Sequence, residues 1–333
     1  MDPRVVAAVR RYGAMDPATW GTGLSAPGAR EALSAAIERV LDGPWQAPSP
    51  PPPTVVIWCA GNVFTAPLEW TAQLVAAGSR VVLKAPSASP TPVLALAEAF
   101  AGLGVEAHAA PHQDAWPLLD RADAVLGMGS DAAMAELGER LPEDLPRSLH
   151  GHRVSFAIVE GSSLELAHAL ALDAALYDGA GCMSPAAAFC LGDAERLAAH
   201  LAVAMAEAER RWPRGHVDPA IGPRWRTRVG LARILGTSHE GPSWAVPLLP
   251  LAHAEATVLP RMLPVHPVAD LRHLAALAEL PLSSVATDRA IDLPFPRICA
   301  PGELQAPRTN RHHDGVDVMA VLGGSGTPAG PKP

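Results

Sequence analysis

One cysteine stands on a turn that carries few large side chains. In the segment ALYDGAGCMSPAAAFCLGD, residues 175–193, Cys182 lies among Gly and Ala, ahead of Ser184-Pro185 and an apolar run. Small neighbours let a carbonyl carbon reach the sulfur, and backbone N–H groups on such a turn can stabilise an oxyanion. We therefore predict that Cys182 is a nucleophile. The alternative is a buried structural thiol, which is the commonest state of a free cysteine.

The other cysteines are 59, 190 and 299, and none forms a CxxC pair or a disulfide-type spacing. Cys59 and Cys190 lie inside apolar, strand-like runs, so we expect structural roles for them. A reduced, cytoplasmic protein fits this usage. No metal site is predicted.

Polar or small residues stand where several strand-like runs end. Asn62 follows the first run, Lys84 ends the second, Gly129 and Ser130 follow the fourth, and Glu160 ends the fifth. Parallel sheets bind ligands beyond the carboxyl ends of their strands, so we predict that these residues share a ligand site. Each also has an ordinary explanation: a turn residue, a solvated strand end, a helix cap or a surface acid.

Short apolar runs alternate with helical patterns through residues 54–175, which predicts parallel βαβ units. We expect an α/β fold with two domains. The predicted parts are N-terminal helices with a proline-rich connector (1–53), a cofactor domain (54–160), a catalytic domain (161–290) and a C-terminal segment (291–333). The Gly/Pro-rich tail from Gly323 is expected to be disordered.

The composition excludes several classes of protein. With 333 residues, 49% hydrophobic and 18% charged, the chain is globular rather than disordered. A formal charge of −8 argues against a general nucleic-acid binder. No apolar stretch reaches the length of a membrane span, and the N-terminus has no signal-peptide core.

The order of these pieces resembles the aldehyde dehydrogenase superfamily, and within it the LuxC-type acyl-CoA reductases. GNVFTAPLEWTAQLVAAGSRVVLKAPSASP is similar to the segment from the family's catalytic Asn to its K-P-S-E-x-T-P-type cofactor motif. VLGMGSDAAMAEL resembles the helix start that meets the cofactor pyrophosphate. GAGCMSPAAAFCLGD is similar to the Cys turn, and RICAPGELQAPRTNRHHDG resembles the C-terminal pattern of LuxC-type reductases.

The resemblance implies an aldehyde-dehydrogenase-like fold with a shortened N-terminal region, in which part of the oligomerisation element is missing. It implies that Cys182 is the nucleophile, Asn62 the oxyanion donor and Glu160 a proton shuttle. Lys84, Ser87, Gly129 and Ser130 would then bind the cofactor. The resemblance is also compatible with assembly into a homo-oligomer.

The chain also departs from the family pattern. The acid that normally accepts hydrogen bonds from the adenosine ribose is Ser87 here, which removes a negative charge facing a 2′-phosphate and indicates NADPH. The segment LPRMLPV resembles the family's E-I-F-G-P motif, with Leu259 to Arg261 where the ribose-binding Glu would stand.

Three functions remain open from the sequence. The first is NADPH-dependent reduction of an acyl-CoA or acyl-carrier-protein thioester to an aldehyde, the second is aldehyde oxidation, and the third is a silent binding or scaffold subunit. His239 and His253 are alternative bases. Seven arginines could meet CoA phosphates or an acidic carrier protein, or lie on a solvated face with acid partners: 210, 211, 214, 224, 226, 228 and 233.

Overall fold

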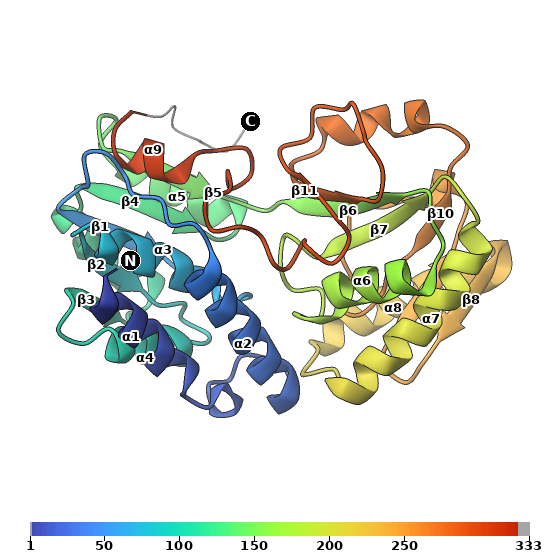
Figure 1. Ribbon diagram of the computed structural model, residues 1–333, viewed down its shortest axis with the longest axis horizontal. Coiled ribbons are helices and arrows are strands. Elements are labelled where there is room, and N and C mark those ends of the chain that lie inside the picture. The colour runs from blue at the N-terminus through green and yellow to red at the C-terminus, as the bar shows by residue number, and fades with distance from the viewer. Residues whose placement is uncertain (1, 326–333) are drawn as a thin grey trace. The chain divides into compact units, whose positions relative to one another are not determined.

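The computed structural model describes residues 2–325, and these divide into two compact units. Unit 1 contains residues 2–22, 32–152 and 308–325, and unit 2 contains residues 23–31 and 153–307. Each unit has its own sheet, of five strands in unit 1 and seven in unit 2 (Figure 1). The predicted α/β class with two domains is confirmed.

The sheet of unit 1 is entirely parallel, in the order β3-β2-β1-β4-β5. This is the doubly wound order in which ligands bind where the chain reverses direction across the sheet, between β1 and β4. Its strands are β1 (Thr54–Trp58), β2 (Arg80–Lys84), β3 (Val105–His108), β4 (Ala124–Met128) and β5 (Arg147–His150).

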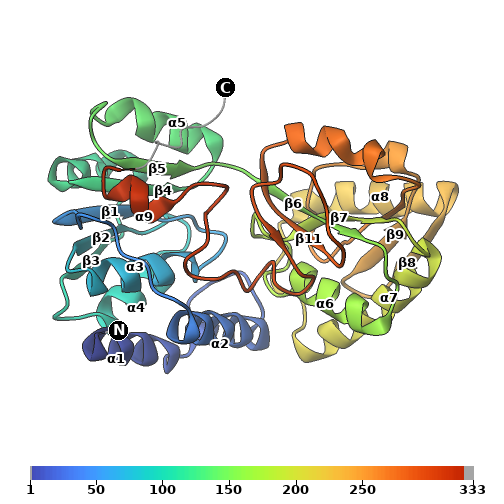
Figure 2. The same ribbon diagram turned by 45° about the horizontal axis from the view of Figure 1, so that its top comes forward.

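Helices cover both faces of this sheet (Figure 2). On one face α5 (Asp131–Arg140) and η3 (Trp116–Arg121) pack against Val56, Val82 and Val125. On the other lie α3 (Ala66–Ala76) and α4 (Thr91–Ala99), with α1 (Pro3–Gly13) packed on both helices. Unit 1 also contains η1 (Pro17–Thr19), η2 (His112–Asp114) and most of α2 (Ala26–Asp42). Both faces are therefore buried, which explains the almost continuous apolar sequence of these strands.

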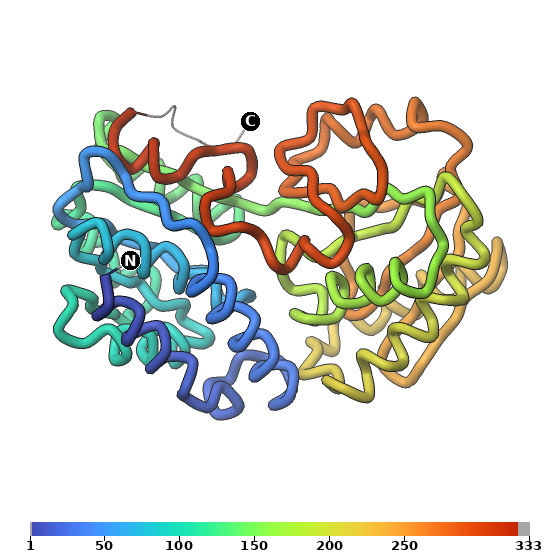
Figure 3. The backbone as a smooth tube through the Cα atoms, in the orientation of Figure 1, coloured from blue at the N-terminus to red at the C-terminus, as the bar shows by residue number. Residues whose placement is uncertain are grey.

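The last described residues return to unit 1 (Figure 3). Helix α9 (Val318–Leu322) packs against β5 and β4, and the Arg311 guanidinium forms a 2.6 Å ion pair with buried Glu69. Gln73 donates a hydrogen bond to the carbonyl of Thr309. The segment from 308 to 325 is thus an ordered part of unit 1. Of the tail predicted to be disordered, residues 326–333 lie outside the described residues.

The sheet of unit 2 runs in the order β12-β11-β6-β7-β10-β9-β8, and only the β8–β9 pair is antiparallel. Helices α6 (Leu164–Ala175) and α7 (Ala194–Arg211) cover one face through buried apolar residues such as Ala171, Ala198 and Leu201. Its strands are β6 (Val154–Val159), β7 (Pro185–Cys190), β8 (Thr237–Glu240), β9 (Ala245–Leu248), β10 (Val265–Pro267), β11 (Leu282–Thr287) and β12 (Ile298–Cys299). The remaining helices are η4 (Pro219–Ile221), α8 (Gly222–Leu235), η5 (Leu251–His253) and η6 (Leu271–Glu279).

The boundary between the units falls at His152–Arg153, ahead of the strand that ends at Val159. That strand, β6, pairs with β7 and β11 rather than with the sheet of unit 1. The structure therefore differs from the predicted division after residue 160. A local sequence pattern identifies a buried strand but does not say which sheet it joins. No helix among residues 2–325 combines the length and the apolar character that a bilayer span requires.

Candidate active site

Cys182 lies on a tight turn at the amino end of β7. The Ser184 N–H donates to the carbonyl of Gly181 at 3.0 Å, and the carbonyl of Cys182 accepts a 2.8 Å hydrogen bond from the hydroxyl of Ser155 on β6. Gly181 and Ser184 are buried, whereas Cys182 is half-buried. The turn is fixed through its backbone, and Cys182 itself stays partly exposed.

The segment that resembles the LuxC-type C-terminal pattern packs behind this turn. The Gln305 side-chain amide donates to the Ser184 hydroxyl at 2.9 Å and to the Asp173 carbonyl at 3.0 Å. Arg297 reaches the Ser284 hydroxyl at 3.1 Å and lies 3.8 Å from the sulfur of Met183. The C-terminal motif therefore supports the residues on either side of Cys182.

Buried Asp173 ties α6 to the same segment. Its carboxyl group accepts hydrogen bonds from the N–H groups of Gly302, at 2.7 Å, and Gln305, at 3.3 Å. Burial raises the pKa of the Asp173 carboxyl to about 7, even though these N–H groups oppose the rise by favouring the carboxylate.

A buried ion pair holds the segment that precedes the Cys182 turn. The Arg261 guanidinium contacts the Asp178 carboxylate, which also accepts a 2.8 Å hydrogen bond from the Gly215 N–H. Both Asp178 and Arg261 have positive φ, and Arg261 is only 2% exposed. Arg261 belongs to the segment that replaces the family's ribose-binding motif. In this chain its guanidinium pairs with Asp178, and both residues belong to unit 2.

The other cysteines are poorly suited to nucleophilic chemistry. Burial raises the pKa of the Cys59 thiol to about 12 and that of Cys299 to about 11, and it also raises the pKa of Cys190. A thiolate is the reactive form, so these sulfurs are inert at neutral pH.

Glu160 lies far from Cys182, contrary to the role predicted for it. It follows the carboxyl end of β6, whereas Cys182 precedes the amino end of the parallel strand β7. Glu160 lies five positions beyond Ser155, which bonds the Cys182 carbonyl, and this corresponds to on the order of 16 Å along a strand. The Glu160 carboxylate is 62% exposed and pairs with Arg289 at 3.0 Å. It therefore matches the alternative of a surface acid.

Asn62, Lys84 and Ser87 lie in neighbouring loops at the carboxyl edge of the unit 1 sheet. Trp58 and Lys84 are paired residues at the ends of β1 and β2, and a Cβ placed on Gly61 would lie 3.3 Å from Pro86. The loops that carry Asn62 and Ser87 are thus in contact. Both residues are exposed.

Lys84 is the buried member of this group, with 3% of the residue exposed. Burial lowers the pKa of its ammonium group. Within residues 2–325 no hydrogen bond or ion pair involves its Nζ atom, which lies 5.3 Å from the centroid of the Trp58 indole. Burying a cation in this way is costly unless a ligand compensates it, which makes Lys84 a candidate ligand-binding group.

Gly129 and Ser130 stand at the amino end of α5. The Ser130 hydroxyl accepts a 3.2 Å hydrogen bond from the Ala133 N–H, so it caps the helix as the ordinary explanation expects. Asp131 in the first turn accepts from the His152 N–H at 2.7 Å and adds negative charge there. The pyrophosphate role of Gly129 and Ser130 stays a prediction.

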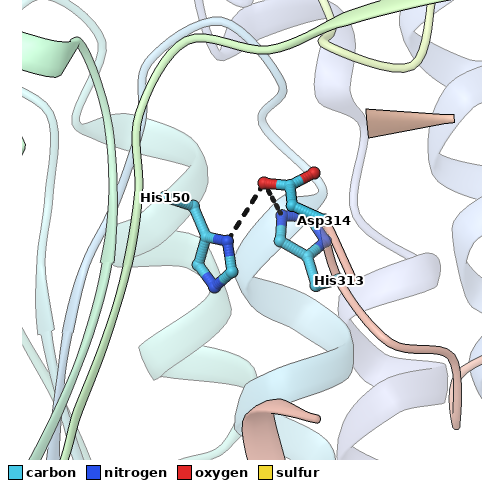
Figure 4. Close-up of side chains that lie close together, drawn as sticks. All are labelled: His150, His313 and Asp314. Atoms are coloured by element: carbon cyan, nitrogen blue, oxygen red, sulfur yellow. Dashed lines mark hydrogen bonds and ion pairs between the residues drawn. The ribbon is translucent and has the colours of Figure 1, made fainter. Parts of the chain in front are cut away.

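Unit 1 also contains a buried cluster of His150, His313 and Asp314 (Figure 4). His150 Nε2 bonds the Ser148 hydroxyl at 2.8 Å, and its Nδ1 bonds Asp314 at 3.1 Å. His313 Nε2 lies 3.8 Å from the same Asp314 oxygen, while its Nδ1 lies 3.4 Å from Arg311. A metal ion would displace partners from these ring nitrogens beside a guanidinium cation. We therefore interpret the cluster as a hydrogen-bonded anchor for the C-terminal segment.

A model of the LuxC acyl-CoA reductases matches residues 48–275 of this sequence. The chain belongs to the LuxC acyl-CoA reductase family. The family indicates an oxidoreductase that acts on acyl or aldehyde groups. A comparison with curated protein sequences found no match.

Several solved structures share the fold of this LuxC-family chain. Substrate-bound Staphylococcus aureus AldH is 13% identical, with a TM-score of 0.67, over 98% of this chain and 86% of that one. An acetylating aldehyde dehydrogenase from Geobacillus thermoglucosidasius is 12% identical, with a TM-score of 0.65, over 91% and 81%. An NAD-dependent benzaldehyde dehydrogenase from Corynebacterium glutamicum is 16% identical, with a TM-score of 0.65, over 91% and 82%. The aldehyde dehydrogenase fold is therefore confirmed.

The arginine-rich stretch of this LuxC-family protein is largely paired. Four of the seven arginines have acid partners, and buried Arg228 contacts Glu255 at 2.6 Å. Arg214 donates to a backbone carbonyl and Arg224 to a threonine hydroxyl. These contacts favour the alternative of a solvated, internally paired surface over a cluster reserved for phosphates.

Neither alternative base lies in a strand next to the Cys182 turn. His239 is in β8, which β9 and β10 separate from β7, and His253 ends η5. Sequence reasoning missed Ser155, Asp173, Asp178 and Gln305, which hold the turn. Gln305 could have been found, because it occupies the Gln of the R-I-C-P-x-G-x-x-Q pattern. No motif in the sequence marks the other three residues.

Proposed function

We propose that this protein reduces an acyl thioester, of CoA or of an acyl-carrier protein, to an aldehyde through an acyl-Cys182 intermediate and with NADPH as reductant. The observation that carries the proposal is half-buried Cys182 on a turn held by two hydrogen bonds. Ser155 of β6 bonds the Cys182 carbonyl, and Gln305 of the LuxC-type C-terminal motif bonds the Ser184 hydroxyl.

Cys182 would attack the thioester carbonyl as a thiolate, forming an S–C bond as the carbonyl becomes an oxyanion. Its own backbone N–H and the Asn62 amide are the proposed donors to that oxyanion. Collapse then breaks the bond to the departing thiolate and leaves an acyl-cysteine. Because a thiolate leaves readily, this step needs little acid assistance.

When bound, NADPH supplies the hydride that reduces the acyl group. Lys84 fits a nucleotide because the residue is buried and its ammonium makes no ion pair within residues 2–325. Exposed Ser87 adds no negative charge to its loop, so a 2′-phosphate meets a cation without a competing acid.

The position of Glu160 favours this reaction over aldehyde oxidation. Oxidation requires water to be activated for hydrolysis of the acyl-cysteine, and Glu160 lies at the wrong end of β6 for that task. The Cys182 end of β6 begins Arg153-Val154-Ser155, which includes no acid. Thioester reduction needs no hydrolytic base.

The test is mass spectrometry after mixing the protein with a panel of acyl-CoAs without NADPH. We expect the protein mass to rise by one acyl group, and peptide mapping to place the adduct on Cys182. Adding NADPH should remove the adduct and release an aldehyde. An adduct on another cysteine, or none with any chain length, would refute the proposal. Binding of NADPH without any adduct would favour aldehyde oxidation, and no binding would favour the silent homologue.

A further inference from the structure

Lys84 is held by an aromatic ring rather than by an acid. Its Nζ atom lies 5.3 Å from the centroid of the Trp58 ring, within the range of a cation–π interaction. The two side chains extend from paired residues of adjacent parallel strands, so they share one face of the sheet. The nearby Cys59 supplies no counter-charge at neutral pH, because burial raises the pKa of its thiol to about 12.

Trp58 is itself fixed by other aromatic residues. Its ring stacks on Trp116 with centroids 5.1 Å apart, and His112 meets both rings edge-on, at 5.1 and 4.7 Å. The Arg140 guanidinium lies 4.1 Å from the Trp116 ring centroid. Glu136 contacts His112 and Arg140, each at 3.2 Å. Trp58 is 3% exposed, so its indole has little freedom to move.

We propose that Trp58 is a positioning residue for the cofactor, because its indole holds the Lys84 ammonium at the carboxyl edge of the sheet without neutralising its charge. This inference rests on the proposed function, in which Lys84 meets the nucleotide. A carboxylate in the place of Trp58 would hold the lysine equally well but would cancel the charge that attracts a phosphate. A ring face stabilises the cation and leaves its full charge for a ligand.

The arrangement favours a cofactor with a 2′-phosphate. That group carries about −1.5 to −2 charge, as phosphate monoesters do, whereas the ribose of NADH offers only hydroxyls. Loss of the cation–π contact should therefore weaken NADPH more than NADH. A residue that only fills the core would not discriminate between them.

The experiment replaces Trp58 site-specifically by tryptophans that carry one to four ring fluorines. Fluorine withdraws π density stepwise while the ring keeps nearly its natural size, so packing is preserved and cation–π attraction falls. We expect the Kd of NADPH, measured by calorimetry, to rise with each fluorine to about tenfold. The Kd of NADH should change less than twofold.

Trp70 provides a matched control, because the Arg311 guanidinium lies 5.7 Å from its ring centroid and Trp70 is also 3% exposed. The same fluorine series at Trp70 should leave both dissociation constants unchanged. If fluorination at Trp58 leaves the Kd of NADPH unchanged, or if fluorination at Trp70 raises that Kd equally, the positioning role is wrong.

Lys84→Met, measured in parallel, separates this inference from the proposed function. If that variant weakens NADPH while the Trp58 series is flat, the cofactor site stands and only the role of Trp58 fails. If Lys84→Met changes neither cofactor, the cofactor site and the role of Trp58 both fail.

Discussion

Glu160 and Cys182 lie at opposite ends of one pair of parallel strands, β6 and β7. Glu160 follows the first strand and lies in solvent, beside Arg289, whereas Cys182 precedes the second, beside the Ser155 hydroxyl. Parallel strands place residues that follow one strand far from residues that precede its neighbour. The acid and the thiol therefore belong to different edges of the sheet.

Glu160→Gln should consequently leave catalysis intact. We expect the rates of acyl-adduct formation and of aldehyde release to stay within about twofold of wild type. The free energy of unfolding should change by less than about 1 kcal/mol, since the Arg289 pair is exposed. Stopped-flow acylation and urea unfolding measure the two quantities. A loss of a hundredfold or more in rate would restore Glu160 as a proton-transfer group.

Cys182, which precedes β7, and Cys190, which ends it, should behave differently. Cys182→Ala should abolish aldehyde formation and leave NADPH binding intact, because only the nucleophile is removed. Cys190→Ala removes a buried sulfur from the core and should cost ~1 kcal/mol or somewhat more of stability, with activity retained. Aldehyde production, cofactor calorimetry and thermal unfolding distinguish the variants. The reverse pattern would move the nucleophile to Cys190.

Gln305→Leu should weaken the support of the Cys182 turn. The variant leaves the Ser184 hydroxyl and the Asp173 carbonyl without their Gln305 partner, at a cost of about 1–3 kcal/mol in unfolding free energy. We also expect slower acylation, by roughly tenfold, because the turn loses its support. The exposed neighbour Glu303→Gln serves as the control. Equal acylation rates in both variants would show that Gln305 contributes to stability alone.

Asp173 should make stability depend on pH. Its pKa is raised to about 7 in the folded protein, against 3.8 ordinarily, so the native state keeps a proton that the unfolded state releases. The free energy of unfolding should therefore fall as pH rises from about 4 to 7, by up to a few kcal/mol. Asp173→Asn removes this titration, so its urea midpoint should depend less on pH between about 4 and 7 than that of the wild type. Parallel slopes for wild type and variant would contradict the raised pKa.

Ser87→Glu should shift the cofactor preference. The added carboxylate would repel a 2′-phosphate by about 1–2 kcal/mol after screening, or roughly tenfold in the ratio of NADPH to NADH affinity. Lys84→Ala should likewise weaken NADPH more than NADH. Ala88→Glu places the same charge one residue further along the exposed loop and is the matched control. An unchanged ratio in Ser87→Glu would mean that this loop does not meet the adenosine ribose.

Much of this protein follows from local sequence. Strand-like runs that alternate with amphipathic segments predicted the α/β class, because side-chain periodicity and burial are properties of consecutive residues. Small residues around Cys182 predicted an open turn for the same reason. Ser130 ahead of a helical pattern left a helix cap as the alternative to a cofactor role, and its bond to Ala133 shows that it does cap the helix.

Tertiary structure decided the rest. The sequence identified the strand before Glu160 but not its sheet, since strand pairing joins residues far apart in the chain. The contacts that hold the Cys182 turn are equally distant: Asp178 meets Arg261 across 83 positions, and Gln305 meets Ser184 across 121. Likewise, only the packing of Trp58, His112 and Trp116 revealed that an indole holds Lys84. Hydrophobic patterning fixes which residues are buried, whereas the choice of partner depends on how the buried faces meet in three dimensions.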